Sequence, residues 1–219
     1  MGLLIAITGG SGSGKSTLAR ALADALPQGT ATVVLEDWYY QDAAAMPGFD
    51  PAAFDFDDVA ARDHALLAAH LTELKAGRSV KAPVYSLKTH GRDPGGIPVP
   101  AVPVTIIEGI HLLATPALVP LYDLKVFVDT PADIRFIRRL LRDQTERART
   151  AQSVIDQYLK TVRPGHERFT EPGRVLADFV VADQTAAVVL EDRQAVDRLA
   201  APVLAHPLLA PFRRTELQG

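Results

Sequence analysis

The chain has 219 residues, 47% of them hydrophobic, and a formal net charge of -3. This length suits one α/β domain over residues 1–219. No apolar run nears the roughly 20 residues of a bilayer span, and no basic leader precedes the first predicted strand. We therefore expect a cytoplasmic protein with no membrane partner. The absence of cysteine excludes a disulfide framework, a thiolate nucleophile and a cysteine-based zinc site, and the charge gives no indication of a nucleic-acid partner.

The first predicted strand, residues 3–7, runs directly into a glycine-rich segment with the Walker A pattern: Gly9, four residues, then Gly14-Lys15-Ser16. A helix-forming run over residues 18–23 follows it. Glycines let backbone N–H groups surround phosphate oxygens, the helix N-terminus adds its positive dipole end, and Lys15 adds a full charge. The alternative is a glycine-rich loop that binds no nucleotide. We predict an ATP site with Ser16 as a Mg²⁺ ligand, formed by Gly9, Gly10, Ser11, Gly12, Ser13, Gly14, Lys15, Ser16 and Thr17.

Two further predicted strands end in acidic residues. Residues 32–35 lead into Glu36-Asp37, and residues 104–107 lead into Glu108. Ligands of open parallel sheets bind beyond the carboxyl ends of the strands, so Asp37 and Glu108 should share a crevice with the glycine-rich segment. Asp37 would reach the terminal phosphate, and Glu108 would hold Mg²⁺ directly or through water. The structural alternatives are a turn or helix cap for Asp37 and a hydrogen bond to a loop for Glu108.

The segment between these strands, about residues 41–103, reads as a substrate-binding insertion. Residues 41–57 are polar and aromatic with Gly and Pro, which predicts an ordered loop over a site. Asp57 or Asp58 should cap a helix that runs through Lys75, and the Pro-rich residues 94–103 should form a loop. The expected buried face of that helix is Leu67, Leu71 and Leu74, with Gly77 as its stop, while His64 and His70 should be surface or half-buried residues.

A strand over residues 124–129 precedes a helix with two distinct faces. Its arginines dominate residues 135–149, where six arginines stand against two acids, so this segment carries +4 and the rest of the chain -7. We predict that the arginine face contacts phosphate or substrate, against the alternative of a solvated charged face. The predicted packing face holds Ile134, Phe136, Ile137, Leu140 and Leu141, and the arginine face holds Arg135, Arg138, Arg139 and Arg142.

A mobile lid is expected over about residues 143–170. Its helix should carry Val154 and Val162 on one face and break at Arg163-Pro164-Gly165. Residues 175–181 read as the last core strand, and residues 190–204 as a closing helix within a C-terminal region of about 189–219, with a Pro-rich tail over residues 202–211. Together these elements predict a P-loop NTPase fold: a doubly wound, mainly parallel sheet with helices on both faces and a small lid.

Over residues 3–181 the chain resembles the uridine kinases (uridine-cytidine kinases), within the phosphoribulokinase and uridine kinase group of P-loop enzymes. The resemblance rests on blocks that occur in the family's order. After the Walker A loop these are Asp37-Trp38-Tyr39-Tyr40, Gly48-Phe49-Asp50, Pro83-Val84-Tyr85, Thr89-His90-Gly91-Arg92, Ile107-Glu108-Gly109-Ile110, Arg138-Arg139-Leu140-Leu141-Arg142-Asp143 and Glu146-Arg147-Ala148-Arg149.

The resemblance implies a kinase that transfers the γ-phosphate of ATP or GTP to the 5'-hydroxyl of uridine or cytidine, giving UMP or CMP in pyrimidine salvage. It implies that Asp37 is the general base, that Lys15, Arg142 and Arg147 stabilise the transferring phosphoryl group, and that Mg²⁺ is the cofactor. Family members are often oligomeric, which implies a homo-oligomer. The implied metal site comprises Ser16, Glu108 and Asp37, and the implied substrate-binding residues are Tyr40, Asp50, Tyr85, His90, Arg139, Arg149 and Gln157.

The sequence departs from the family at a few positions. Ala148 stands where the family usually has Gly between the two lid arginines, and the loop between Asp50 and Asp55 is one residue shorter, which could displace Asp50. Ala182-Asp183-Gln184 replaces the usual Pro-Arg-Gly, which leaves the choice of ATP or GTP open. The alternatives are a related kinase that acts on nicotinamide riboside, pantothenate or a sugar phosphate, and, more remotely, an ATPase motor or nucleotide switch.

Overall fold

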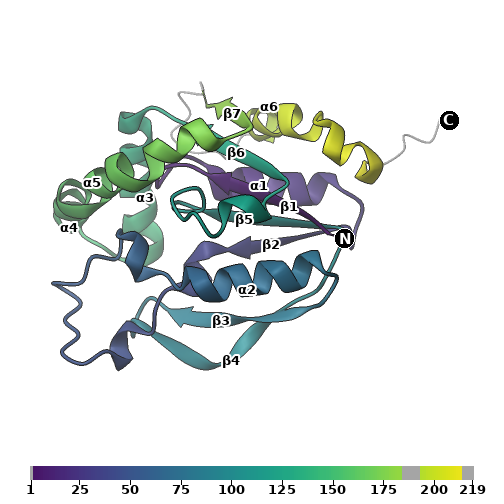
Figure 1. The fold of residues 1–219 in the computed structure, drawn as a ribbon. Coiled ribbons are helices and arrows are strands. Elements are labelled where there is room, and N and C mark those ends of the chain that lie inside the picture. The colour runs from purple at the N-terminus through teal and green to yellow at the C-terminus, as the bar shows by residue number, and fades with distance from the viewer. Residues whose placement is uncertain (1, 184–192, 214–219) are drawn as a thin grey trace.

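The computed structural model describes residues 2–183 and 193–213. At its centre five parallel strands hydrogen-bond in the order β2-β5-β1-β6-β7 (Figure 1). Residues Ile7 of β1 and Leu35 of β2 both pair with Glu108 of β5, so the three strands end side by side. The predicted mainly parallel sheet is confirmed. Its strands are β1 (Leu3–Thr8), β2 (Ala31–Leu35), β5 (Val104–Gly109), β6 (Leu124–Asp129) and β7 (Phe179–Ala182).

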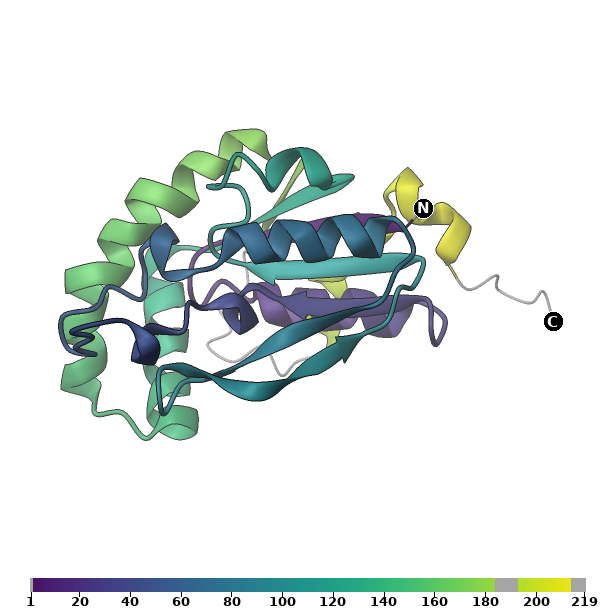
Figure 2. The same cartoon turned by 60° about the horizontal axis from the view of Figure 1, so that its bottom comes forward.

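Helices cover both faces of this sheet, as the doubly wound fold requires (Figures 1 and 2). Alternate residues of β1 serve the two faces: Ile5 and Ile7 pack with α1 (Lys15–Ala25) and α6 (Arg193–Leu204). Leu4 and Ala6 pack instead with α2 (His64–Lys75). β1 is therefore apolar from Leu3 to Ile7, the pattern of a strand in a sheet buried on both sides.

Helix α2 begins later than the sequence predicted. Its cap is Asp63, whose side chain accepts from the N–H of Leu66, while Asp58 caps only a short 3-10 turn, Val59–Ala61. The delay has a physical reason: Arg62 pairs with Tyr40 in an isolated antiparallel bridge, which holds the chain extended just before the helix. The other part of the prediction is confirmed, since Leu67, Leu71 and Leu74 are buried and Gly77 ends the helix at a φ of 80°.

The Pro-rich loop predicted over residues 94–103 is instead largely a strand. β3 (Val80–Ser86) and β4 (Gly91–Val99) form a separate antiparallel hairpin with an irregularity between Ala82 and Val84. A ribbon of two strands has two outer edges, so a proline that lacks an N–H can face outward without losing a ladder hydrogen bond. Prolines therefore mark edge strands here rather than a loop.

The two faces of α3 (Ala132–Arg147) are the reverse of those predicted. Arg135, Arg138 and Arg139 are buried, whereas Ile137 and Leu141 are 37% and 42% exposed. The arginine face packs towards the glycine-rich loop, where polar partners replace water; Arg135 Nε, for example, donates to the carbonyl of Thr130 at 3.0 Å. Periodicity located the two faces but did not show which of them faces the protein.

The lid is one continuous bent helical segment. It begins with α4 (Ala151–Gln157) and continues through α5 (Arg163–Gly165), so the predicted break at residues 163–165 is wrong. Wide π-helical turns, Tyr158–Val162 and His166–Thr170, flank α5. Pro164 therefore lies inside a continuous helical segment, where the wide turns on either side accommodate a residue that has no N–H to donate.

The C-terminal predictions are confirmed in part. The last strand begins at Phe179 rather than residue 175, because Glu171–Leu176 forms a 3-10 turn that leaves Val175 86% exposed. Residues 190–192 of the predicted closing helix lie outside the described residues, and the helix that follows is α6. The Pro-rich region predicted as a tail continues α6 and adds a 3-10 turn, Pro207–Phe212, whose Leu209 is buried. None of the helices in the described ranges has the length and apolar character needed to cross a membrane.

Ala148 follows α3 at a φ of 50°, in the left-handed region, and its N–H bonds to the carbonyl of Asp143. A side chain at this φ is strained, so we expect Ala148→Gly to raise the free energy of unfolding by about 0.5–1 kcal/mol in urea denaturation. Ala69→Gly, in the middle of α2, is the matched control and should lower it by about 1 kcal/mol. Equal losses in both variants would contradict this assignment of strain.

Candidate active site

The glycine-rich loop has the backbone of a phosphate cradle. Gly14 lies at a φ of 89° immediately before α1, and Gly12 at a φ of 82° packs so closely that a Cβ would lie 2.2 Å from the carbonyl oxygen of Arg135. No other residue fits at Gly12 without moving α3. The start of α1 at Lys15 leaves its first N–H groups directed at the loop, as an anion site needs.

The acidic end of β5 meets this loop, as predicted. Ser16 Oγ donates to Glu108 Oε1 at 2.9 Å, and Lys15 Nζ lies 3.9 Å from Glu108 Oε2. Burial raises the pKa of Glu108, while the nearby Lys15 opposes that rise. A hydroxyl and a carboxylate oxygen are the hard donors that Mg²⁺ prefers. Across residues 2–183 and 193–213 no cluster of three or more His, Asp or Glu side chains offers an alternative metal site.

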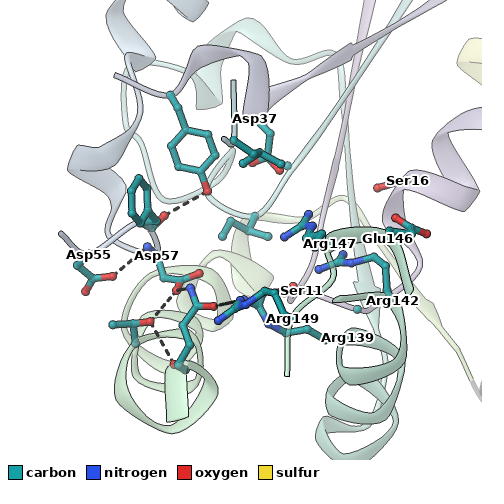
Figure 3. Close-up of a pocket in the computed structure, with 18 of the residues that line it drawn as sticks. Ser11, Ser16, Asp37, Asp55, Asp57, Arg139, Arg142, Glu146, Arg147 and Arg149 are labelled. Carbon is teal, nitrogen blue, oxygen red and sulfur yellow. Dashed lines mark hydrogen bonds between the residues drawn. The ribbon is translucent and has the colours of Figure 1, made fainter. Parts of the chain in front are cut away.

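A cavity of about 1570 Å³ extends from the glycine-rich loop to the lid and to the loop of residues 51–57 (Figure 3). Its volume exceeds the usual range of about 300–1,000 Å³ for one small ligand, which leaves room for two substrates. Most of the predicted site residues line it. They are Ser11, Gly12, Gly14, Lys15, Ser16, Thr17, Asp37, Tyr40, His90, Glu108, Arg139, Arg142, Arg147, Arg149 and Gln157.

Asp37 presents its carboxylate to this cavity. It follows β2 in a 3-10 turn, Glu36–Tyr39, and its side chain is 61% exposed. Arg62 Nη2 donates to Asp37 Oδ1 at 3.2 Å. The carboxylate is thus held on one side and open to a ligand on the other, an arrangement that suits a group which must accept a proton.

Arg62, which the sequence did not indicate as a site residue, links several residues that line the cavity. Its guanidinium donates to the hydroxyl of Tyr40 at 2.7 Å and to the carbonyl of Phe56 at 3.2 Å, and it lies 4.3 Å from the centre of the Tyr40 ring. Arg62 is only 4% exposed and belongs to no motif. Its role depends on the Tyr40 bridge, a long-range pairing that sequence periodicity does not reveal.

The charge of Arg62 is balanced by the buried Glu36, 3.6 Å from its Nε. Glu36 also accepts from the N–H groups of Ile110 (2.7 Å) and His111 (3.2 Å) and from His64 Nε2 (2.8 Å). Burial opposes the ionisation of Glu36, but Arg62 and these donors outweigh it and hold its pKa well below the usual range. His64 is therefore a buried partner of a carboxylate and not the surface or half-buried residue that was predicted.

The end of the cavity away from the glycine-rich loop, which we call the acceptor end, contains Asp57 instead of the predicted Asp50. Asp50 is exposed, lies outside the cavity lining, and accepts from the N–H of Ala52 at 2.9 Å in a local turn. Asp57 is buried in the lining and accepts from Thr161 Oγ1 at 2.7 Å and Gln157 Nε2 at 3.3 Å. The shortened loop, noted in the sequence, was the one available signal that Asp50 would be displaced.

Aromatic rings cover the same end. The ring centroids of Phe56 and His90 are 4.8 Å apart and the planes of the two rings meet at 31°. The ring centroids of Tyr85 and Tyr40 are 4.9 Å apart. The hydroxyl of Tyr85 and Nδ1 of His90 are buried without a hydrogen-bond partner in the described part of the chain. His90 lines the cavity, so its unpaired Nδ1 is available to a polar ligand there, whereas the predicted site residue Tyr85 lies outside the lining.

Four arginines form the opposite wall (Figure 3). Arg139 Nη1 donates to Ser11 Oγ at 2.8 Å and its Nη2 donates to Gln157 Oε1 at 2.9 Å, so it joins the glycine-rich loop to the acceptor end. Arg149 donates to the same Gln157 oxygen. Arg142 and Arg147 line the cavity beside them. The four arginines thus line the cavity, and their contact with substrate or phosphate stays a prediction.

A parallel doubly wound sheet with a glycine-rich phosphate cradle, an acidic strand end and an arginine-lined lid defines a P-loop phosphotransferase. Residues 4–189 match the family described as Phosphoribulokinase / Uridine kinase family, and the chain belongs to that family.

Curated relatives and a solved structure agree with this placement. The chain is 41% identical over 181 residues to the uridine kinase of Oceanobacillus iheyensis, covering 83% of this chain and 86% of that protein. It is also 41% identical to the uridine kinase of Alkaliphilus metalliredigens, covering 83% and 87%. The phosphoribulokinase of Rhodobacter spheroides superimposes with a TM-score of 0.58 at 17% identity, over 83% of this chain and 70% of that one, and supports the fold alone.

Burial of His111 makes stability depend on pH. Burial lowers its pKa to about 4, with Arg62 and His64 adding to the effect against Glu36. Between pH 7 and 5 the unfolded chain therefore takes up a proton that the folded protein does not, so the free energy of unfolding should fall by about 2 kcal/mol from this residue. Arg62 Nη1 lies 3.3 Å from His111 Nδ1, and His111→Asn keeps an acceptor for it. In urea denaturation at pH 7, 6 and 5, the free energy of unfolding of this variant should depend less on pH than that of the native protein. Parallel curves for the two proteins would show that another group is responsible.

Proposed function

We propose that the protein is a nucleoside kinase that transfers the γ-phosphate of ATP, or GTP, to the 5'-hydroxyl of uridine or cytidine and releases UMP or CMP. The observation that carries the proposal is the acceptor end of the cavity. There the open carboxylate of Asp37, the ring pair of Phe56 and His90, and the unpaired Nδ1 of His90 lie within one cavity that begins at the phosphate cradle. A flat polar base and a primary alcohol fit that combination, and the two named relatives are uridine kinases.

Each reacting group has an assigned residue in this proposal. Asp37 orients the 5'-hydroxyl and accepts its proton as the oxygen attacks phosphorus. Lys15 and the cradle N–H groups bind the phosphates, and Arg142 and Arg147 stabilise the charge that spreads over the transferring group. Ser16 and Glu108 would hold Mg²⁺, with Asp37 near enough to the same space to contribute; the metal neutralises phosphate charge when bound.

We assign the ribose hydroxyls to Asp57, because its carboxylate faces the cavity, whereas Asp50 lies outside it. Tyr40 and His90 would contact the base, with Tyr85 packed against Tyr40. Arg139, Arg149 and Gln157 would support Asp57 from the lid. The cytoplasmic location and the homo-oligomer stay predictions.

The two aspartates give a matched pair of variants. Asp57→Asn removes a charged acceptor from two hydroxyls and should raise the KM for uridine about 10- to 100-fold. Asp50→Asn changes an exposed turn and should leave that KM within about twofold of the native value. Steady-state kinetics with saturating ATP measure both. The reverse order of effects would assign the ribose hydroxyls to Asp50 instead of Asp57.

The function itself is tested by measuring ADP release with a panel of acceptors: uridine, cytidine, purine nucleosides, nicotinamide riboside, pantothenate and ribulose 5-phosphate. We expect turnover with uridine or cytidine and little with the phosphorylated sugar. Turnover with another member of the panel alone would keep the phosphotransferase and replace the acceptor. ATP hydrolysis that no acceptor stimulates would instead favour a motor or switch.

Asp37→Asn in the same assay tests the proposed base. Turnover should fall about 10²- to 10⁴-fold while binding of an ATP analogue persists, because the cradle is intact. Asp93→Asn, an exposed carboxylate on β4, controls for loss of a charge. Turnover that is unchanged in the Asp37 variant would remove Asp37 from the mechanism.

A further inference from the structure

Asp143 lies behind the arginine wall. It is fully buried in α3 and does not line the cavity. Arg142 Nε and Nη2 donate to its Oδ1 at 3.0 and 2.7 Å, and Arg149 Nη1 donates to its Oδ2 at 3.4 Å. Arg139 Nε lies 3.7 Å from Oδ2, and Arg147 Nη1 lies 3.6 Å from Oδ1. One carboxylate thus contacts these four arginines, while Arg138, which also lines the cavity, pairs with Asp183 instead.

Such a carboxylate must be charged to be tolerated. Burial favours its neutral form, but Arg142 and Arg139 outweigh burial and keep the pKa of Asp143 below its usual value. Four guanidinium groups gathered in one wall also repel one another unless a negative charge lies between them. Asp143 supplies that charge from the side away from the cavity, where it does not face the phosphates.

The backbone of Asp143 fixes the same region. Its carbonyl accepts the N–H of Ala148 and, at 3.1 Å, the N–H of Arg149, which closes the left-handed turn after α3. That turn reverses the chain so that Arg149 returns to the carboxylate. Arg149 and Arg139 then both reach Gln157, which donates to Asp57. A continuous set of contacts therefore runs from Asp143 to the acceptor end.

We propose that Asp143 is a positioning residue that holds two arginine pairs, Arg142 with Arg147 and Arg139 with Arg149, in their working arrangement before the substrates bind. The first pair serves the transferring phosphoryl group and the second serves the acceptor through Gln157. This role rests on the proposed function, because the proposed function places the transferring phosphoryl group at one end of the cavity and the acceptor at the other. Asp143 touches neither substrate and acts only through the arginines.

Asp143→Asn keeps the shape of the side chain and removes its charge. We expect kcat to fall about 10²-fold, because misplaced arginines stabilise the transition state poorly, and the KM for uridine to rise about tenfold. The affinity for a non-hydrolysable ATP analogue, measured by calorimetry, should stay within about threefold, since the glycine-rich loop and Lys15 do not contact Asp143. Asp133→Asn, an exposed carboxylate in the first turn of α3, is the matched control and should match the native protein.

A merely structural Asp143 would lower the melting temperature without separating uridine from the ATP analogue, and that result overturns the proposal. So does a variant whose kcat and uridine KM both match the native protein. If the Asn variant does not fold, Asp143→Glu replaces it: restored charge should keep uridine affinity and lower kcat only in part, and lost uridine affinity in folded protein overturns the idea. If uridine is not a substrate, the same measurements are made with the compound of the acceptor panel that is phosphorylated. Failure of uridine as a substrate therefore overturns the proposed function but leaves the comparison of the Asp143 variants with the native protein intact.

Discussion

The site depends first on the register of three parallel strands. Ile7 of β1 and Leu35 of β2 both pair with Glu108 of β5, so the chain leaves all three strands at the same edge of the sheet. This constraint puts the glycine-rich loop, Asp37 and Glu108 at one place, although about 100 residues separate the first from the last. A shift of one residue in the register of β5 would move the side chain of Glu108 to the opposite face of the sheet.

The second requirement is charge balance in a protein whose site is rich in arginine. Two buried carboxylates meet it in the same way. Glu36 stands behind Arg62 at the end of β2, and Asp143 stands behind the arginines of α3 and the lid. In both places the guanidinium groups face the cavity and the carboxylate lies on the protein side. Arg62 is buried beneath the cavity, whereas Arg142, Arg147 and Arg149 pack around one carboxylate without mutual repulsion and stay partly exposed to a ligand.

Sequence reasoning was accurate where the chemistry is local. The Walker A segment and the acids at strand ends need only a strand, a turn and a few residues, and the structure has them as predicted. It failed where a partner distant in the chain decides the outcome. The faces of α3 were reversed because burial of its arginines depends on Asp183 and the glycine-rich loop, which both lie outside the helix. The buried positions of Arg62 and His64 were not predicted for the same reason, since both side chains pair with Glu36.

The acceptor end shows why the parallel sheet alone does not determine the substrate. Its walls come from the loop of residues 51–57, the β3–β4 hairpin and the lid, and none of these belongs to the five-stranded sheet. Rings join the first two, since Phe56 packs on His90, and the contact of Asp57 with Thr161 joins the loop to the lid. The acceptor can therefore differ between proteins that share this sheet, because the elements around the acceptor end lie outside it.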